Sequence, residues 1–350
     1  MKRNIIGKSK IELAALGMGC WSYGGGSYWG AQAQKDVDEI VHAALDEGIN
    51  YFDTAEVYND GESERSLGLA LKGVRHRAVI GSKVSTSNVR PDVLVQHCED
   101  SLRRLNTDYI DIYMLHWPVN PRAIAHFSSN GDAMSDIPPI AEVFGALQRL
   151  KEQGKIREIG VSNHGVKQMR EVLDTGVEIA VNELPYNLIS RAIEGEILPF
   201  CIENEISVLG YMAYQQGILA GVYDDIGKVP PAQAHSRHFH FSRGGEQSRH
   251  GEEGVEAELQ LLMSELRGIA ETLGCSVADV SLAFAMQCQG ISCTLVGSRT
   301  LQELSANIAA AQRVLPEETL ELLKKLSKPV WDKLGNSPDY YENRKVSRIW

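Results

Sequence analysis

Residues 78–105 of the 350-residue chain read AVIGSKVSTSNVRPDVLVQHCEDSLRRL and contain one complete strand-then-helix unit. The segment begins with a short apolar run rich in β-branched residues, which is typical of a buried strand. Its second half has the period of a helix, because apolar side chains recur three or four positions apart, at Leu94, Cys98, Leu102 and Leu105. A strand followed by a helix of this length predicts a crossover to a neighbouring parallel strand.

The same unit recurs along the whole chain. Strand-like runs lie at 15–21, 50–54, 78–84, 110–116, 156–163, 179–186, 206–214 and 292–298. Helix-like runs lie at 35–48, 63–73, 92–105, 139–153, 165–174, 192–204, 256–273 and 300–312. Eight alternating strands and helices predict an α/β fold of the (β/α)8 class, a TIM barrel. The rival fold is a doubly wound open sheet, but the glycines at 24–26 lack the GxGxxG spacing that such a sheet normally carries.

Three additions surround the predicted barrel, and we find no linker that would divide residues 1–350 into two domains. Residues 1–13 predict a small hairpin, with its turn at 7–9, that caps the barrel floor. Residues 222–255 form a long insertion after the seventh strand, and a loop of this length is typically a lid, a binding loop or a disordered segment. Residues 315–327 predict an extra helix, and 328–350 an irregular aromatic tail.

Composition narrows the possible partners and compartments. Lys and Arg number 35 and Asp and Glu number 46, so the net charge of −11 disfavours binding to a nucleic-acid backbone. The six cysteines form no CxxC pair, which favours reduced thiols and a cytoplasmic location. We find neither a signal-peptide pattern nor an apolar run near the ~18 residues of a membrane span. The histidines of 222–255 lack metal-ligand spacing and lie among arginines, so we predict no metal.

Ionisable residues follow three neighbouring predicted strands. Asp53 ends the second strand, Lys83 the third and His116 the fourth, and Tyr58 lies on the loop after the second strand. Catalytic groups of (β/α)8 barrels project from these carboxyl ends. Each residue alone has an ordinary structural interpretation, such as a helix cap for Asp53 or a half-buried aromatic for Tyr58.

Together these four residues suit proton donation to a carbonyl oxygen. A nearby ammonium lowers the pKa of a phenol, so Lys83 would make Tyr58 a better acid while Asp53 holds Lys83 in place. His116 would orient the carbonyl and stabilise charge on its oxygen. The hydride that such a reaction needs comes from a nicotinamide cofactor, since no side chain supplies it.

The sequence resembles the aldo-keto reductase superfamily over essentially the whole chain. The stretches that carry the resemblance are FDTAEVY (52–58), GSK (81–83), LHWP (115–118), IREIGVSN (156–163) and GILAG (217–221). The resemblance implies that Tyr58 is the general acid and base, that Asp53 and Lys83 tune it, and that His116 orients the carbonyl.

The resemblance also implies a cofactor site. Ser162 and Asn163 would bind the nicotinamide carboxamide, and Tyr211 would stack under the ring. The loop from Gln216 to Gly221 would line the pyrophosphate. The remaining predicted cofactor ligands are Gly217, Leu219, Gly297, Ser298, Arg299 for a 2′-phosphate, and Asn307 for the adenine.

Two residues depart from the family pattern. Glu183 replaces the usual glutamine of the sixth strand that binds the carboxamide, so it would contact the carboxamide or instead face the substrate. Glu303 stands where NADPH-preferring members often have Arg or Gln, and a carboxylate there would repel a 2′-phosphate or accept from a ribose hydroxyl. Arg299 favours NADP, and NAD is the alternative.

The mouth of the site is predicted to contain Trp21, Tyr23, Trp117 and the loops 121–138 and 222–255, which would suit many small carbonyl or alcohol substrates. We therefore predict an NAD(P)(H)-dependent oxidoreductase that reversibly reduces an aldehyde or ketone, including sugar-derived ones. The alternative is a cofactor-binding sensor or regulatory subunit with the same fold. A hydrolase or lyase lacks support in the motifs, and the sequence leaves the oligomeric state open.

Overall fold

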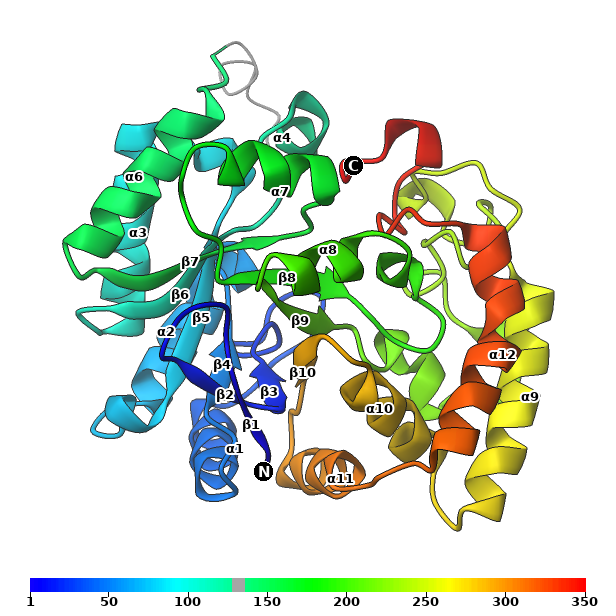
Figure 1. Cartoon of the computed structure of the whole chain (residues 1–350). Helices are drawn as coiled ribbons and strands as arrows, with labels where there is room; N and C mark the ends of the chain where they lie inside the picture. Colours follow the sequence, from blue (N-terminus) through cyan, green and yellow to red (C-terminus); the bar gives the residue numbers. More distant parts are fainter. Residues whose placement is uncertain (128–135) are drawn as a thin grey trace.

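The computed structural model describes residues 1–127 and 136–350 and confirms the closed eight-stranded parallel barrel (Figure 1). Its strands pair around the barrel in the order β10-β3-β4-β5-β6-β7-β8-β9, with β10 closing onto β3. Their bounds are β3 Leu16–Gly19, β4 Tyr51–Asp53, β5 Val79–Val84, β6 Ile110–Leu115, β7 Ile156–Ser162, β8 Val181–Pro185, β9 Ser207–Tyr211 and β10 Ile291–Val296.

Helices surround these strands and pack their buried residues against them (Figure 1). Helix α3, for example, buries the four residues whose spacing predicted it, from Leu94 to Leu105. The helices that flank the barrel are α1 Gln34–Asp46, α2 Glu62–Ala70, α3 Pro91–Leu105, α6 Ile140–Glu152, α7 Val166–Leu173, α8 Ile197–Glu203, α10 Val277–Gln287 and α11 Leu301–Ala311.

The predicted N-terminal hairpin closes one end of the barrel. Strands β1 Arg3–Ile5 and β2 Glu12–Ala14 pair antiparallel, and the backbone amide of Gly7 donates to the Ser207 hydroxyl at 3.0 Å. Ile6 and Leu13 pack against the inward-facing apolar side chains of the barrel strands. A plugged floor leaves the carboxyl ends of the strands as the open end, which is where the predicted site residues lie.

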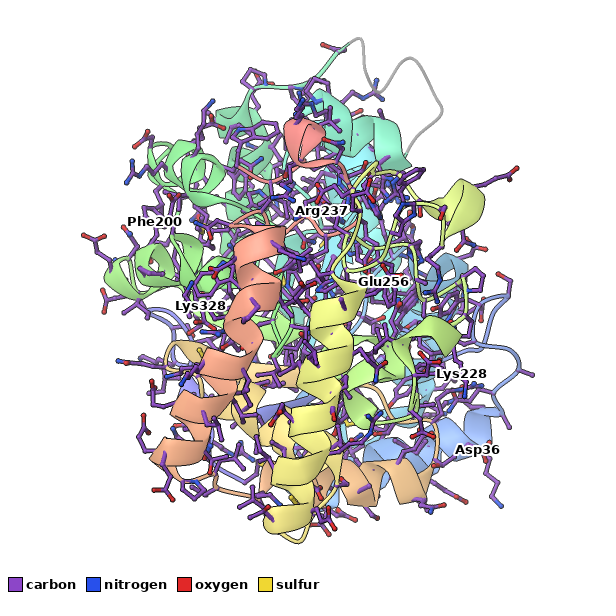
Figure 2. All side chains as sticks on the ribbon, turned by 90° about the vertical axis from the view of Figure 1, so that its right-hand side faces the viewer. Asp36, Phe200, Lys228, Arg237, Glu256 and Lys328 are labelled. Atoms are coloured by element: carbon purple, nitrogen blue, oxygen red, sulfur yellow. The ribbon has the colours of Figure 1, made fainter. Side chains whose placement is uncertain are left out.

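The sequence prediction missed two helices and misplaced a boundary. Helix α10 lies where we had expected only a connection to the eighth strand, and the short helix α4 Pro121–Phe127 lies in a segment predicted as loop. The extra C-terminal helix is α12 Glu317–Leu334, so it extends beyond the predicted 315–327, and the tail begins at 335. It packs beside α9 Glu256–Thr272 on the outside of the barrel (Figures 1 and 2).

The insertion 222–255 and the tail 335–350 pack together, and we call them the roof. Arg237 is fully buried, and its guanidinium donates to the backbone oxygens of Leu334, Ser337 and Asp339 at 2.9, 2.6 and 3.3 Å. Figure 2 shows Arg237 near the ends of α9 and α12. The insertion therefore packs against the tail through these contacts, and its role as a lid stays a prediction.

No single helix among the described residues is long and apolar enough to span a membrane; the bent pair α9 and α10 reaches that length and hydropathy only when joined across a 96° bend.

Candidate active site

Asp53 and Lys83 form a buried ion pair at the carboxyl ends of neighbouring strands. Register places Asp53 beside Gly81, so the two side chains emerge from adjacent strands, β4 and β5. The Lys83 ammonium lies 2.6 Å from Asp53 Oδ1 and also donates to the Thr54 backbone oxygen at 3.0 Å. Burial lowers the pKa of Lys83, but Asp53 and Glu183 raise it more, so its net pKa is raised and the ammonium stays charged.

Tyr58 lies over this ammonium. The Lys83 Nζ atom is 5.1 Å from the centroid of the Tyr58 ring. The turn that follows Tyr58 is left-handed at Asn59, Asp60 and Gly61. Asn59 tolerates this conformation, and its amide donates to the backbone oxygens of Trp21 and Tyr23 at 2.7 and 3.0 Å. Sequence reasoning missed Asn59, which fixes the loop that carries the phenol.

The pKa of Tyr58 departs from our expectation. Lys83 does lower it, but burial raises it more, and the carboxyls of Asp53 and Glu183 raise it further, so the net pKa lies above that of free tyrosine. The phenol is therefore fully protonated at neutral pH, as a proton donor must be. The ammonium acts by stabilising the phenolate that forms once the proton has left.

His116 completes the predicted tetrad. Its ring lies 5.7 Å from the Tyr58 ring, centroid to centroid, in an edge-to-face arrangement. Burial and the Lys83 charge lower the pKa of His116, so the imidazole is neutral at pH 7. Its Nδ1 atom is buried and has no hydrogen-bond partner among the described residues. The structure thus brings Asp53, Lys83, Tyr58 and His116 together around one position.

Glu183 also lies in this cluster, beside both Lys83 and Asp53. Its Oε1 atom is 3.4 Å from Lys83 Nζ, and its side chain is only 4% exposed. Its Oε2 atom is buried and has no partner among the residues that the structure describes. Burial raises the pKa of Glu183, and the nearby Asp53 raises it further.

The predicted nicotinamide ligands meet beside Glu183. The hydroxyl of Ser162 and the backbone amide of Asn163 donate to the Glu183 backbone oxygen at 3.0 and 2.9 Å. The Tyr211 hydroxyl donates to Asn163 Oδ1 at 2.7 Å, which fixes a partly exposed ring at the end of β9. A flat ring flanked by amide groups and by an unpartnered carboxyl oxygen fits a nicotinamide with its carboxamide.

The predicted pyrophosphate loop has an unusual backbone. Gln215, Gln216 and Gly217 all have positive φ, at 44°, 54° and 97°, and Gly221 has φ 76°. Such conformations strain residues other than glycine and cluster at functional sites. Within this loop Leu219 is buried, whereas Gln216, Gly217 and Gly221 are partly exposed.

The start of α11 differs from the predicted 2′-phosphate site. The Arg299 guanidinium already donates to the backbone oxygens of Trp29 and Ala31 at 2.6 and 2.9 Å. The Glu303 carboxylate accepts from the Arg299 backbone amide at 2.6 Å, so it occupies a donor that a phosphate would use. Arg299 thus ties two loops together in this structure.

The neighbouring residues are also engaged. Asn307 is buried; it accepts from the Tyr214 hydroxyl at 2.9 Å and donates to the Ser298 hydroxyl at 3.0 Å and to the Gly297 backbone oxygen at 3.3 Å. The amide predicted to bind adenine is therefore fully paired within the protein, and Ser298 is buried beside it.

The predicted mouth is only partly correct. Trp21 is 40% exposed, and its ring centroid lies 6.1 Å from that of Tyr58, so its role at the mouth stays a prediction that the structure allows. Tyr23 is fully buried, because its loop turns inward after Cys20, and the prediction that it lines the mouth is wrong. The Trp117 ring is covered by the Arg348 guanidinium at 3.8 Å. Part of the predicted loop 121–138 lies outside the described residues.

The tail, which the sequence suggested could reach the site or a partner subunit, packs near the strand ends. Arg348 forms a buried pair with Asp339 at 2.7 Å, and the Tyr341 hydroxyl contacts the Met212 sulfur at 3.6 Å. The described residues contain no group of His, Cys, Asp or Glu side chains that could hold a metal.

Comparison with known proteins identifies the family of the chain. The sequence model of the Aldo/keto reductase family matches residues 15–328. An NADH-specific methylglyoxal reductase of Escherichia coli is 28% identical over 348 residues, covering 93% of this chain and 98% of that protein. The protein tas of Escherichia coli is 30% identical over 355 residues, with coverages of 91% and 96%.

Solved structures give the same result. An aldo-keto reductase from Klebsiella pneumoniae in complex with NADPH matches with a TM-score of 0.70 and 26% identity, covering 100% of this chain and 99% of that one. A glycerol dehydrogenase from Gluconobacter oxydans matches with a TM-score of 0.73 and 27% identity, covering 96% and 97%. The fold and the strand-end residues define a barrel oxidoreductase. The chain belongs to the aldo/keto reductase family.

Proposed function

We propose that the chain catalyses the reversible, NAD(P)H-dependent reduction of an aldehyde or ketone, with Tyr58 as the general acid. The observation that carries the proposal is the buried Lys83 ammonium, which lies 2.6 Å from Asp53 and 5.1 Å from the centroid of the Tyr58 ring. A phenol placed over a fixed ammonium can release its proton to a nascent alkoxide because the phenolate is stabilised in place.

Each residue has one task in this proposal. The bound cofactor supplies the hydride. Tyr58 donates the proton to the carbonyl oxygen, and Lys83 stabilises the resulting phenolate. Asp53 holds Lys83 charged. Neutral His116 donates a hydrogen bond to the same oxygen, and Tyr211 supports the nicotinamide ring.

The cofactor preference rests on the start of α11. Arg299 could bind a 2′-phosphate only by leaving the carbonyls of Trp29 and Ala31, and Glu303 would repel that phosphate. We therefore propose that the chain takes both NADPH and NADH, with affinities within about tenfold of each other, or about 1.4 kcal/mol. The NADH-specific relative and the NADPH-bound structural neighbour both support such a dual site.

The test is turnover of NADPH and NADH with a panel of aldehydes and ketones. Tyr58→Phe should lower kcat by about 10²–10⁴-fold and leave cofactor binding unchanged, because it removes only the proton donor. Tyr109→Phe is the matched control, since Tyr109 lies between Arg75 and Arg157, next to the first residue of β6, at the other end of the strand from His116.

Three outcomes would count against the proposal. Equal rates in Tyr58→Phe and wild type would remove Tyr58 from its role. Cofactor binding without turnover by the wild type on any carbonyl would instead support a sensor or regulatory subunit. If the protein bound neither NADPH nor NADH, the proposed function would be refuted altogether.

A further inference from the structure

Two carboxyl groups, rather than one, lie beside the Lys83 ammonium. Asp53 Oδ1 lies 2.6 Å from its ammonium and Glu183 Oε1 lies 3.4 Å away. The side chains of Lys83, Asp53 and Glu183 are 0%, 5% and 4% exposed. The one positive charge can compensate only one negative charge, so full ionisation would bury a net negative charge, which is energetically costly.

The cluster avoids this cost by keeping one proton, and the geometry indicates where it stays. Asp53 makes the shorter contact with Lys83 and therefore holds the ionised carboxylate. Glu183 is farther away, and its Oε2 atom is buried with no partner among the described residues. Burial and the Asp53 charge raise the pKa of Glu183, which agrees with a protonated Glu183 carboxyl.

Other titratable groups around Glu183 leave this assignment unchanged. Burial raises the pKa of each phenol and thiol near the Glu183 carboxyl, so these groups stay neutral near pH 7. Lys83 is the cation among the residues named next. The groups from all the neighbouring elements are Asp53, Tyr51, Tyr58, Lys83, Tyr211 and Cys293.

We propose that Glu183 stores the proton that carbonyl reduction consumes and passes it through Lys83 to Tyr58. This proposal rests on the function proposed above. Glu183 acts through Lys83, so it is a positioning residue for the proton rather than a group that contacts the substrate oxygen.

The transfers balance. As the hydride bonds to the carbonyl carbon, the Tyr58 O–H bond breaks and its proton bonds to the carbonyl oxygen. The phenolate then takes a proton from the Lys83 ammonium, and the Lys83 amine takes the proton of the Glu183 carboxyl. The tetrad returns to its starting state, and the only change on the protein is that Glu183 has become a carboxylate. Alcohol oxidation runs through the same transfers in reverse.

The end state is electrostatically favourable. Oxidised nicotinamide carries a positive charge that the reduced form lacks. The Ser162 hydroxyl and the Asn163 backbone amide hold the Glu183 backbone oxygen. Burial and, to a smaller extent, the charge of the Glu183 carboxyl raise the pKa of Tyr211, the residue predicted to stack under the ring. An ionised Glu183 therefore suits the oxidised cofactor and a protonated Glu183 suits the reduced one. A glutamine at this position could neither hold nor release a proton.

The experiment counts protons when cofactor binds. Calorimetric titrations of the wild type in buffers of different ionisation enthalpy should show release of about one proton when NAD⁺ binds and none when NADH binds. Glu183→Gln should abolish the release and weaken NAD⁺ binding at least about tenfold relative to NADH binding. Glu64→Gln is the matched control: Glu64 is a buried carboxylate held by Arg104 at 2.6 Å, so NAD⁺-linked release should persist in that variant.

The pH profile of reduction gives a second readout. The wild-type rate should fall as pH rises through the raised pKa of Glu183, because the stored proton is lost above it. That limb should be missing in Glu183→Gln and restored in Glu183→Asp. If the glutamine variant does not fold, as judged by circular dichroism, the wild-type proton count still decides.

The experiment distinguishes failure of the proton-store proposal from failure of the proposed function. Binding of NAD⁺ without proton release in the wild type, or with equal release in Glu183→Gln, would overturn the proton store and leave the proposed function standing. Absence of binding of both NAD⁺ and NADH would refute the function itself.

Discussion

The strand-end cluster and the roof both contain buried charged side chains, but they are held in place in different ways. The strand-end cluster, which comprises Asp53, Tyr58, Lys83, His116 and Glu183, takes its positions mainly from the pairing of β4, β5, β6, β7 and β8. The roof is held by side chains that reach backbone oxygens about a hundred residues away, as Arg237 does with Ser337. The pairing register of the barrel strands therefore positions the strand-end cluster, and individual long-range contacts position the roof.

Because of this difference, the residues proposed to carry out catalysis and the residues that cover them depend on different parts of the structure. The four cluster residues other than Tyr58 lie at or next to adjacent strand ends and stay close together when the roof changes, whereas Tyr58 lies on the loop that Asn59 holds. The roof surrounds the site from outside, where Tyr341 contacts Met212 just beyond β9. Mutations in the two regions should therefore damage different properties, and the following variants test that separation.

The largest expected effect is the loss of roof stability in Arg237→Met. The guanidinium is fully buried and serves three backbone oxygens, so its removal leaves these oxygens without their partner, whereas Glu252, 3.4 Å away, keeps its pair with Arg344. We expect the free energy of unfolding to fall by about 3–5 kcal/mol and the tail to become sensitive to proteases. Urea unfolding and limited proteolysis measure the two effects.

Arg65→Met is the control for this variant. Arg65 pairs with Glu62 across an exposed turn of α2, with side chains 49% and 54% exposed, so its loss should cost less than about 1 kcal/mol. A tail that remains protected in Arg237→Met would mean that the other pairs between the insertion and the tail, Arg249 with Glu342 and Arg344 with Glu252, are enough to hold it.

The same difference explains what the sequence could predict. The barrel, its floor hairpin and the meeting of Asp53, Lys83, Tyr58 and His116 follow from the repeated pattern and the strand ends. Helix α10 was missed because VADVSLAFAMQ is apolar nearly all round and lacks the one-sided period that marks a surface helix. The roof contacts were missed because a backbone oxygen has the same chemistry at every residue.

The hydrogen-bond partners and pKa values of side chains inside the site could not be predicted from the sequence either. Arg299 looks like a free cation at a helix start, but two loop carbonyls occupy it. The net pKa of Tyr58 depends on a balance between burial and Lys83 that only coordinates provide. Position along a strand is thus predictable, whereas the partner that a long side chain selects is not.

A second variant tests whether the Tyr58 loop belongs with the barrel or with the cover. Asn59→Gly keeps the freedom to adopt φ 51° but removes the amide that donates to Trp21 and Tyr23. Displacement of a proton donor by a small distance can cost about 10²-fold, so we expect kcat to fall by about 10–100-fold with little change in cofactor affinity. Single-turnover kinetics measure the step directly. An unchanged rate would mean that β4 alone fixes Tyr58.

The smallest expected effect concerns the start of α11, the predicted site of the cofactor's adenosine end. There the fold provides a helix N-terminus, but the side chain of Glu303 sets the preference between NADPH and NADH. Glu303→Arg replaces the carboxylate that accepts from the Arg299 amide with a cation. It should raise the affinity for NADPH relative to NADH by about tenfold, or about 1.4 kcal/mol, in tryptophan-quenching titrations. Glu317→Arg makes the same charge change in the first turn of α12 and should leave the ratio unchanged. A ratio that stays constant in Glu303→Arg would mean that this carboxylate only caps α11 with Thr300, and that cofactor choice is made elsewhere on the site.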